Sequence, residues 1–111
     1  MSKQKVYFKW DLPRDVVGVV VGICVGYGRR ERAIRQETVA GAVRARYVEL
    51  NAIVDCAMEE IEAGLRREIL DDMTAGRGYC KSAAQYIVGK DTYYRRRNKL
   101  IHDVAKALDL I

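Results

Sequence analysis

Hydrophobic positions recur at alternating steps of four and three through the middle of the chain. This stripe consists of Val43, Tyr47, Leu50, Val54, Ala57 and Ile61. Such spacing places side chains on one face of an α-helix and predicts a long, heptad-patterned helix over about residues 31–62. Ala63 and Gly64 then interrupt the pattern. A shorter amphipathic helix is predicted up to the glycine turn at 76–78, and its apolar face comprises Leu65, Ile69, Leu70 and Met73.

The uncharged run 16–28 is harder to assign. Its valines suit a strand, because β-branched residues pack well on a pleated surface. Pro13 favours a helix start, and glycines at every fourth position would form a groove that a second helix could approach closely. We therefore expect a helix over about 13–27, closed by a left-handed Gly28. The preceding arm, 1–10, mixes lysines with aromatic residues that we expect to cover the core.

Two further helices are predicted at the end of the chain. A short one over 81–88 stops at Gly89, where we expect a left-handed turn. Asp91 then caps a longer helix that runs from 92 to about 108. At about 100° per residue, its core face carries Tyr93, Leu100, Ile101, Val104 and Leu108, with Arg97 on the same side. Thr92, Arg95 and Lys99 point the opposite way, and Arg96 lies on the flank.

Length and composition fit one folded domain. The chain has 111 residues, half of them apolar and only one of them proline. We expect an all-α protein in which 1–62 form an N-terminal arm and two helices, and 63–111 form a helix-turn-helix part. The heptad stripe could also pair with its copy in a homodimer, but pairing within one chain is the simpler expectation.

The excess positive charge is local. Residues 77–111 carry 8 Lys/Arg against 3 Asp/Glu, whereas residues 1–76 carry 12 of each. A concentrated positive field attracts polyanions, because each phosphate paired with Lys or Arg releases condensed counterions. This distribution indicates nucleic acid as the first partner to test, against the alternative of a solvated basic surface.

The predicted elements around this charge have the outline of a helix-turn-helix. Ala84 is small enough to let the two helices approach, and the second helix would place its first two turns in the major groove. Lys81, Ser82 and Lys90 would meet phosphates, which fix register without reading sequence. Thr92, Arg95, Arg96 and Lys99 would face the bases, where an arginine fork can bond guanine O6 and N7 together.

A resemblance to a known family supports this interpretation. Its motifs are RREIL at 66–70, GY at 78–79, SAA at 82–84, DTYYRRR at 91–97, LI at 100–101 and AKAL at 105–108. This series resembles region 4 of sigma factors and, more closely, phage transcription regulators of the ArpU and RinA type. The resemblance implies an all-helical, phage or prophage protein that binds promoter DNA through 92–99 and contacts RNA polymerase with another surface. Nothing in the chain corresponds to the sigma segment that opens promoters.

Other chemistries find little support in the sequence. Cys24, Cys56 and Cys80 are widely spaced, which indicates neither a zinc site nor a disulfide framework and suits a cytoplasmic protein. The apolar run is too short to cross a membrane. The neighbouring carboxylates Asp71 and Asp72 point about 100° apart on a helix, so we interpret them as solvated, with no catalytic role. We expect no cofactor and no enzyme activity.

Three alternatives to a transcription regulator stay open. A small terminase subunit for DNA packaging also joins a helix-turn-helix to an oligomerising helical segment. A helical adaptor would use the heptad stripe to bind a protein, with the basic helix merely solvated. RNA binding is the third, with Tyr93 and Tyr94 as candidate stacking residues.

Overall fold

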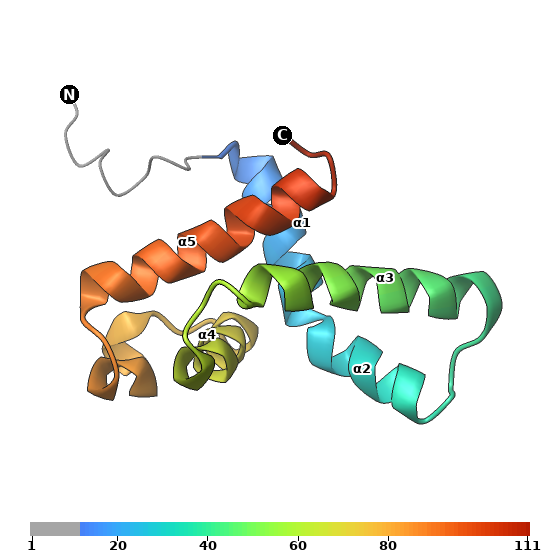
Figure 1. Ribbon diagram of the computed structural model, residues 1–111, viewed down its shortest axis with the longest axis horizontal. Coiled ribbons are helices and arrows are strands. Elements are labelled where there is room, and N and C mark those ends of the chain that lie inside the picture. Colours follow the sequence, from blue (N-terminus) through green and yellow to red (C-terminus); the bar gives the residue numbers. More distant parts are fainter. Residues whose placement is uncertain (1–11) are drawn as a thin grey trace.

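The computed structural model describes residues 12–111, which contain α-helices and short 3-10 helices and no strand (Figure 1). The prediction of an all-α fold is confirmed. In chain order the elements are α1 (Arg14–Val25), α2 (Tyr27–Arg35), α3 (Gly41–Met58), α4 (Ala63–Ala75), η2 (Tyr79–Lys81), η3 (Ala83–Tyr86) and α5 (Lys90–Ala107). The expected aromatic arm lies outside the described residues.

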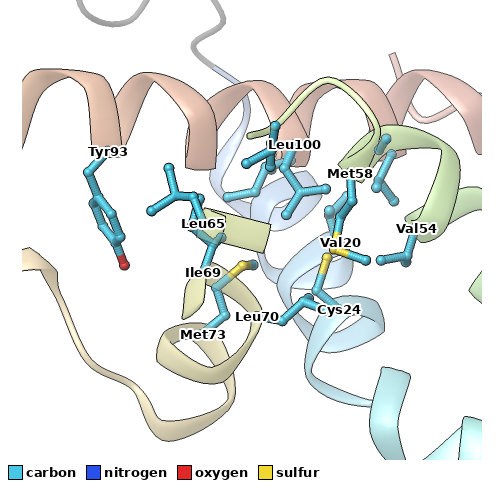
Figure 2. Close-up of a cluster of buried hydrophobic side chains, with 14 of the residues drawn as sticks. Val20, Cys24, Val54, Met58, Leu65, Ile69, Leu70, Met73, Tyr93 and Leu100 are labelled. Atoms are coloured by element: carbon cyan, nitrogen blue, oxygen red, sulfur yellow. The ribbon is translucent and has the colours of Figure 1, made fainter. Parts of the chain in front are cut away.

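Helix α1 is the central element of the core. It packs against both α4 and α5, and against α2, which follows it. The buried side chains Val20 and Cys24 of α1 meet Leu65 and Ile69 of α4 and Leu100 of α5 (Figure 2). Packing of this buried face against α4 and α5 favours a helix for the valine-rich run, as expected, despite its strand propensity.

The glycines of α1 do not play the predicted role. An added Cβ at Gly18 or Gly22 would meet nothing within 4 Å, so no helix in the described part of the chain uses them for a close approach. At Gly26 the chain turns into α2 with φ −78°, and the left-handed ending expected at Gly28 is absent from the described backbone. The backbone of Gly26 is crowded instead, because an added Cβ would lie 2.7 Å from Nη1 of Arg30.

The prediction of one continuous helix over 31–62 is wrong. Helix α2 ends at Arg35, and α3 begins only at Gly41. Glu37 adopts the left-handed conformation (φ 56°), the N–H of Thr38 donates to the carbonyl of Ala33, and the N–H of Glu37 donates to that of Ile34. These bonds form a Schellman ending, which usually contains glycine at the left-handed position. Because Glu37 stands where glycine is usual, nothing in the sequence indicated that a helix ends there.

Helices α2 and α3 form a hairpin that extends beyond the core (Figure 1). Polar side chains join them. The buried Arg30 donates from Nε to Oδ1 of Asn51 at 2.7 Å, and Tyr27 donates to Oδ1 of Asp55 at 2.6 Å. Only the second half of the hydrophobic stripe is buried, whereas Val43 near the start of α3 is 52% exposed. Only the C-terminal part of the stripe therefore packs into the core.

Two glycine substitutions test this description of α1. Gly22→Ala is expected to raise the free energy of unfolding by about 0.5–1 kcal/mol, because alanine fits the open space and limits the unfolded chain. Gly26→Ala is expected to lower it by about 1–2 kcal/mol, because the new methyl group displaces Arg30 from Asn51. Urea unfolding of both variants checks the pair, and equal effects would contradict the packing described for Arg30.

The predicted α-helix over 81–88 is replaced by η2 and η3, which are separated by Ser82 in an extended conformation. The hydroxyl of Ser82 accepts the N–H of Ala84 at 2.9 Å and so begins η3 anew. Gly89 has φ −77°, so it makes no left-handed turn, and Asp91 lies in the first turn of α5 instead of capping it. A helix-turn-helix built from two α-helices over 81–108 is thus not confirmed.

Helix α5 follows its predicted pattern closely. Four members of its expected core face are buried, namely Tyr93, Leu100, Ile101 and Val104, and Leu108 packs beside them. Arg97 also lies on the inner side, where it donates to the Tyr93 hydroxyl at 3.0 Å. The remaining faces of α5 are thereby free to carry the basic residues.

Candidate nucleic-acid interface

Three of the residues predicted to bind DNA are exposed and carry unneutralised charge. Lys81 ends η2, Lys90 begins α5, and Arg95 lies one and a half turns along it. Among the described residues, no carboxylate forms an ion pair with any of the three. Helix α5 also begins without a side-chain cap, so its first N–H groups add positive potential at this end.

Arg96 and Lys99 are neutralised by carboxylates. Arg96 donates twice to Glu62, at 2.9 and 3.0 Å, in the bidentate geometry that arginine and carboxylate favour. Lys99 donates to Asp103 at 2.6 Å and lies 3.8 Å from Glu60. The Arg96 hydrogen bonds lower the pKa of Glu62 to about 2, so this carboxylate is ionised throughout the physiological range. Both cations therefore hold α5 against the segment between α3 and α4.

The hydroxyl of Ser82 is not presented to solvent as predicted. Ser82 is buried, where its hydroxyl donates to Oε2 of Glu68 at 3.1 Å. This corrects its assignment to the interface, because a buried hydroxyl that is already donating has nothing to offer a phosphate. Thr92 is half-buried in the first turn of α5.

Two apolar side chains beside these cations were not predicted from the sequence. Tyr86, at the end of η3, is 89% exposed, and the neighbouring Ile87 is 49% exposed. They lie between Lys81 and Lys90 along the chain. Exposed aromatic rings flanked by basic residues stack on the bases of single-stranded nucleic acid. The exposure of Tyr86 was not predicted, because the sequence indicated an α-helix over 81–88 in place of the two 3-10 helices.

Buried polar contacts fix the position of α5 relative to α4 and η2. Asp72 of α4 is fully buried, where it accepts from the Tyr93 hydroxyl at 2.6 Å and from Nε of Arg77 at 2.9 Å. The prediction that Asp72 is solvated is therefore wrong, although its neighbour Asp71 is exposed. The Tyr94 hydroxyl accepts the N–H of Tyr79 at 3.0 Å. These bonds tie α4 and η2 to the first turns of α5.

The pKa values of two neighbouring carboxylates, Glu68 and Asp72, are shifted in opposite directions. A hydrogen bond to Asp72, together with burial, raises the pKa of Glu68. Burial works against ionisation of Asp72, but its hydrogen bonds with neighbouring side chains outweigh it and lower the pKa. Asp72 is therefore the charged member of the pair, and Glu68 is the one that takes up the first proton.

A pH dependence of stability follows from these shifts. A carboxyl group with a raised folded pKa stabilises the protein below its ordinary pKa, and this contribution disappears as pH rises. Glu68 should thus make the protein less stable as the pH rises above its ordinary pKa of about 4.5, while protonation of Asp72 lowers stability as the pH falls below about 4. We expect Glu68→Gln to flatten the curve from about pH 4.5 upward. Urea unfolding across this range checks it, and an unchanged slope would contradict the assignment.

The described residues contain no cluster of three or more His, Cys, Asp or Glu that could hold a metal. Over the same residues, no helix has the length and apolar character needed to span a bilayer. Cys24, Cys56 and Cys80 are free thiols. In comparisons with protein-family models, curated proteins and solved structures, nothing matched this chain.

Proposed function

We propose that the protein binds duplex DNA through one end of the molecule, which we call the basic edge. It consists of Lys81, Tyr86, Ile87, Lys90 and Arg95. The observation that carries the proposal is that the three cations of this edge have no carboxylate partner among the described residues, while Arg96 and Lys99 beside them do. A positive charge left open to solvent can exchange counterions for phosphates without first breaking an ion pair.

The geometry of α5 suits this role. Its 18 residues extend about 27 Å, and a single helix fits the major groove. Because its inner face is fixed by Tyr93 and the buried Asp72, the outer face is presented rigidly. The resemblance to sigma region 4 and to phage regulators favours regulation of transcription as the purpose of DNA binding, with RNA polymerase as a further partner.

Measurement of DNA affinity at several salt concentrations tests the proposal. Three phosphate contacts predict that the logarithm of the association constant falls with the logarithm of salt concentration at a slope of about −3. Fluorescence anisotropy with a labelled duplex gives this slope directly. No binding at about 0.05 M salt would contradict the proposal, since electrostatic attraction is strongest there.

One carboxylate substitution should strengthen binding. Glu62→Gln removes the charge that neutralises Arg96, the residue that follows Arg95 in α5. We expect duplex affinity to rise by about three- to ten-fold at low salt, because one more cation becomes available to phosphate. Glu31→Gln provides the control, because Glu31 lies in α2 and pairs with Arg35. An unchanged affinity in Glu62→Gln would show that Arg96 does not face the DNA.

The projecting α2–α3 hairpin supports a second candidate function, that of a protein adaptor. Val43 and Val48 are 52% and 41% exposed on α3. Exposed apolar residues on a protruding hairpin suit contact with another protein. A variant with Val43→Ser and Val48→Ser that still binds DNA but loses a partner would support this role.

A further inference from the structure

A second cationic site lies away from the basic edge, in a cleft of about 440 Å³ where α2 faces α4. Its floor is apolar and belongs to the core: Cys24, Met58 and Leu70 are all buried, and Figure 2 shows Cys24 and Leu70 together. Burial raises the pKa of the Cys24 thiol to about 11, so the floor bears no negative charge at neutral pH. This volume falls in the range of small-molecule sites.

Four arginines line the cleft, two from α2 and two from α4, namely Arg29, Arg32, Arg66 and Arg67. Neighbouring groups hold two of them in place: Arg29 donates to the Tyr47 hydroxyl at 3.0 Å, and Arg66 donates to the carbonyl of Ile61 at 2.7 Å. Each still has N–H donors to spare, because a guanidinium carries five.

The other two arginines are available to a ligand. Arg67 is 88% exposed on its side chain and has only a long contact, 3.5 Å, with Asp71. Arg32 is exposed, and none of the described carboxylates forms an ion pair with it. The carboxylates in the lining are Glu31 and Asp71, so the four arginines exceed them by two positive charges.

We propose that this cleft binds a small phosphate monoester with an apolar or aromatic body. A phosphate monoester carries a charge of about −1.5 to −2 at neutral pH, which matches the excess of two positive charges. Arginine forks bind its oxygens in pairs, and the apolar floor accommodates the body of the ligand. The site is recessed between helices, which suits a single small molecule better than the backbone of a duplex. This inference does not depend on DNA binding at the basic edge.

Calorimetric titration with adenosine 5′-monophosphate tests the proposal, with adenosine as the uncharged comparison. We expect the monophosphate to bind at least about ten-fold more tightly than adenosine, and Arg32→Gln/Arg67→Gln to weaken it by about ten-fold or more. Arg14→Gln/Arg44→Gln is the control, because it removes the same charge outside the cleft. A 5′-phosphorylated oligonucleotide, compared with its unphosphorylated form, shows whether the monoester comes from a metabolite or a strand end, and either source supports the site.

Three results would overturn the proposal. These are no measurable binding of the monophosphate to the full chain, equal binding of adenosine, and an equal loss in the control variant. Measuring the duplex affinity of the Arg32→Gln/Arg67→Gln variant distinguishes failure of this proposal from failure of DNA binding at the basic edge. We expect it to remain within about two-fold of the unchanged protein, because neither arginine belongs to that edge.

Discussion

Replacement of Lys81, Lys90 and Arg95 by alanine is expected to weaken duplex binding by about 100-fold at about 0.15 M salt. Each exposed cation that meets a phosphate contributes on the order of 1 kcal/mol, and these three have no competing carboxylate among the described residues. The slope of affinity against salt should also become less steep by about one unit for each lost contact. Fluorescence anisotropy at several salt concentrations measures both effects.

A charge-matched variant shows whether duplex binding depends on the basic edge or only on the total positive charge of the protein. Arg14→Ala, Arg44→Ala and Lys106→Ala together remove the same charge from exposed positions elsewhere on the protein. We expect this variant to lose less than about five-fold, because exposed charges farther away than the Debye length are screened. Equal losses in the two triple variants would mean that the basic edge has no special role.

Arg96 and Lys99 should behave differently from the basic edge. Alanine at these two positions removes cations that Glu62 and Asp103 already neutralise. The loss of DNA affinity should therefore be smaller than for the three cations of the basic edge, although the sequence predicted Arg95, Arg96 and Lys99 alike to bind DNA. A larger loss from Arg96 and Lys99 would show that DNA displaces the carboxylates.

The largest loss of stability is expected from Asp72→Asn. This substitution keeps the shape of the side chain but removes the buried charge that accepts from Tyr93 and Arg77. We expect the free energy of unfolding to fall by about 2–3 kcal/mol. The value lies at the low end for a buried pair, because Arg77 is partly exposed and can turn to water. Urea unfolding at neutral pH measures it.

Asp71→Asn is the matched control for this effect. Asp71 is the next residue along α4 and is exposed, with only a long contact to Arg67. Its substitution should change the free energy of unfolding by less than about 0.5 kcal/mol. If the two variants were equally stable, Asp72 could not be the polar anchor between α4 and α5.

Asp72 also shows what periodicity could and could not predict. Residues 65, 69 and 73 define the inner face of α4, and position 72 lies three residues after 69 on that same face. The apolar spacing could therefore have predicted that position 72 faces the core. The carboxylate was interpreted as solvated because the sequence indicated no partner for it. Its partners, Tyr93 and Arg77, come from α5 and the loop before it, and only the tertiary structure brings them together.

The helices with strong apolar patterns were predicted best. The buried face of α5 and the extent of α4 follow directly from their spacing, and Gly76 ends α4 in the left-handed conformation. The missed boundary at Glu37 lacks glycine, and the missed 3-10 geometry depends on the hydroxyl of one buried serine, Ser82. Local hydrogen bonds of this kind leave little trace in a hydrophobic pattern.

The candidate interface was predicted only in part. Lys81, Lys90 and Arg95 are exposed, as the predicted interface requires, but charge counting cannot tell an open cation from a neutralised one. Glu62 lies 34 residues before Arg96, so their pairing depends on how α4 and α5 are placed. Exposure of Tyr86 depended in turn on the 3-10 geometry of η3. Both features become visible only in three dimensions.

Selection of bound sequences from a random duplex pool at about 0.15 M salt tests the central claim most directly. We expect the unchanged protein to enrich one motif and the Lys81/Lys90/Arg95 alanine variant to enrich none. The symmetry of that motif would also indicate whether one copy or two bind. If the protein enriches no sequence, it binds DNA without reading its bases, and regulation of particular genes is contradicted. If the variant enriches the same motif equally well, the basic edge is not the surface that binds DNA.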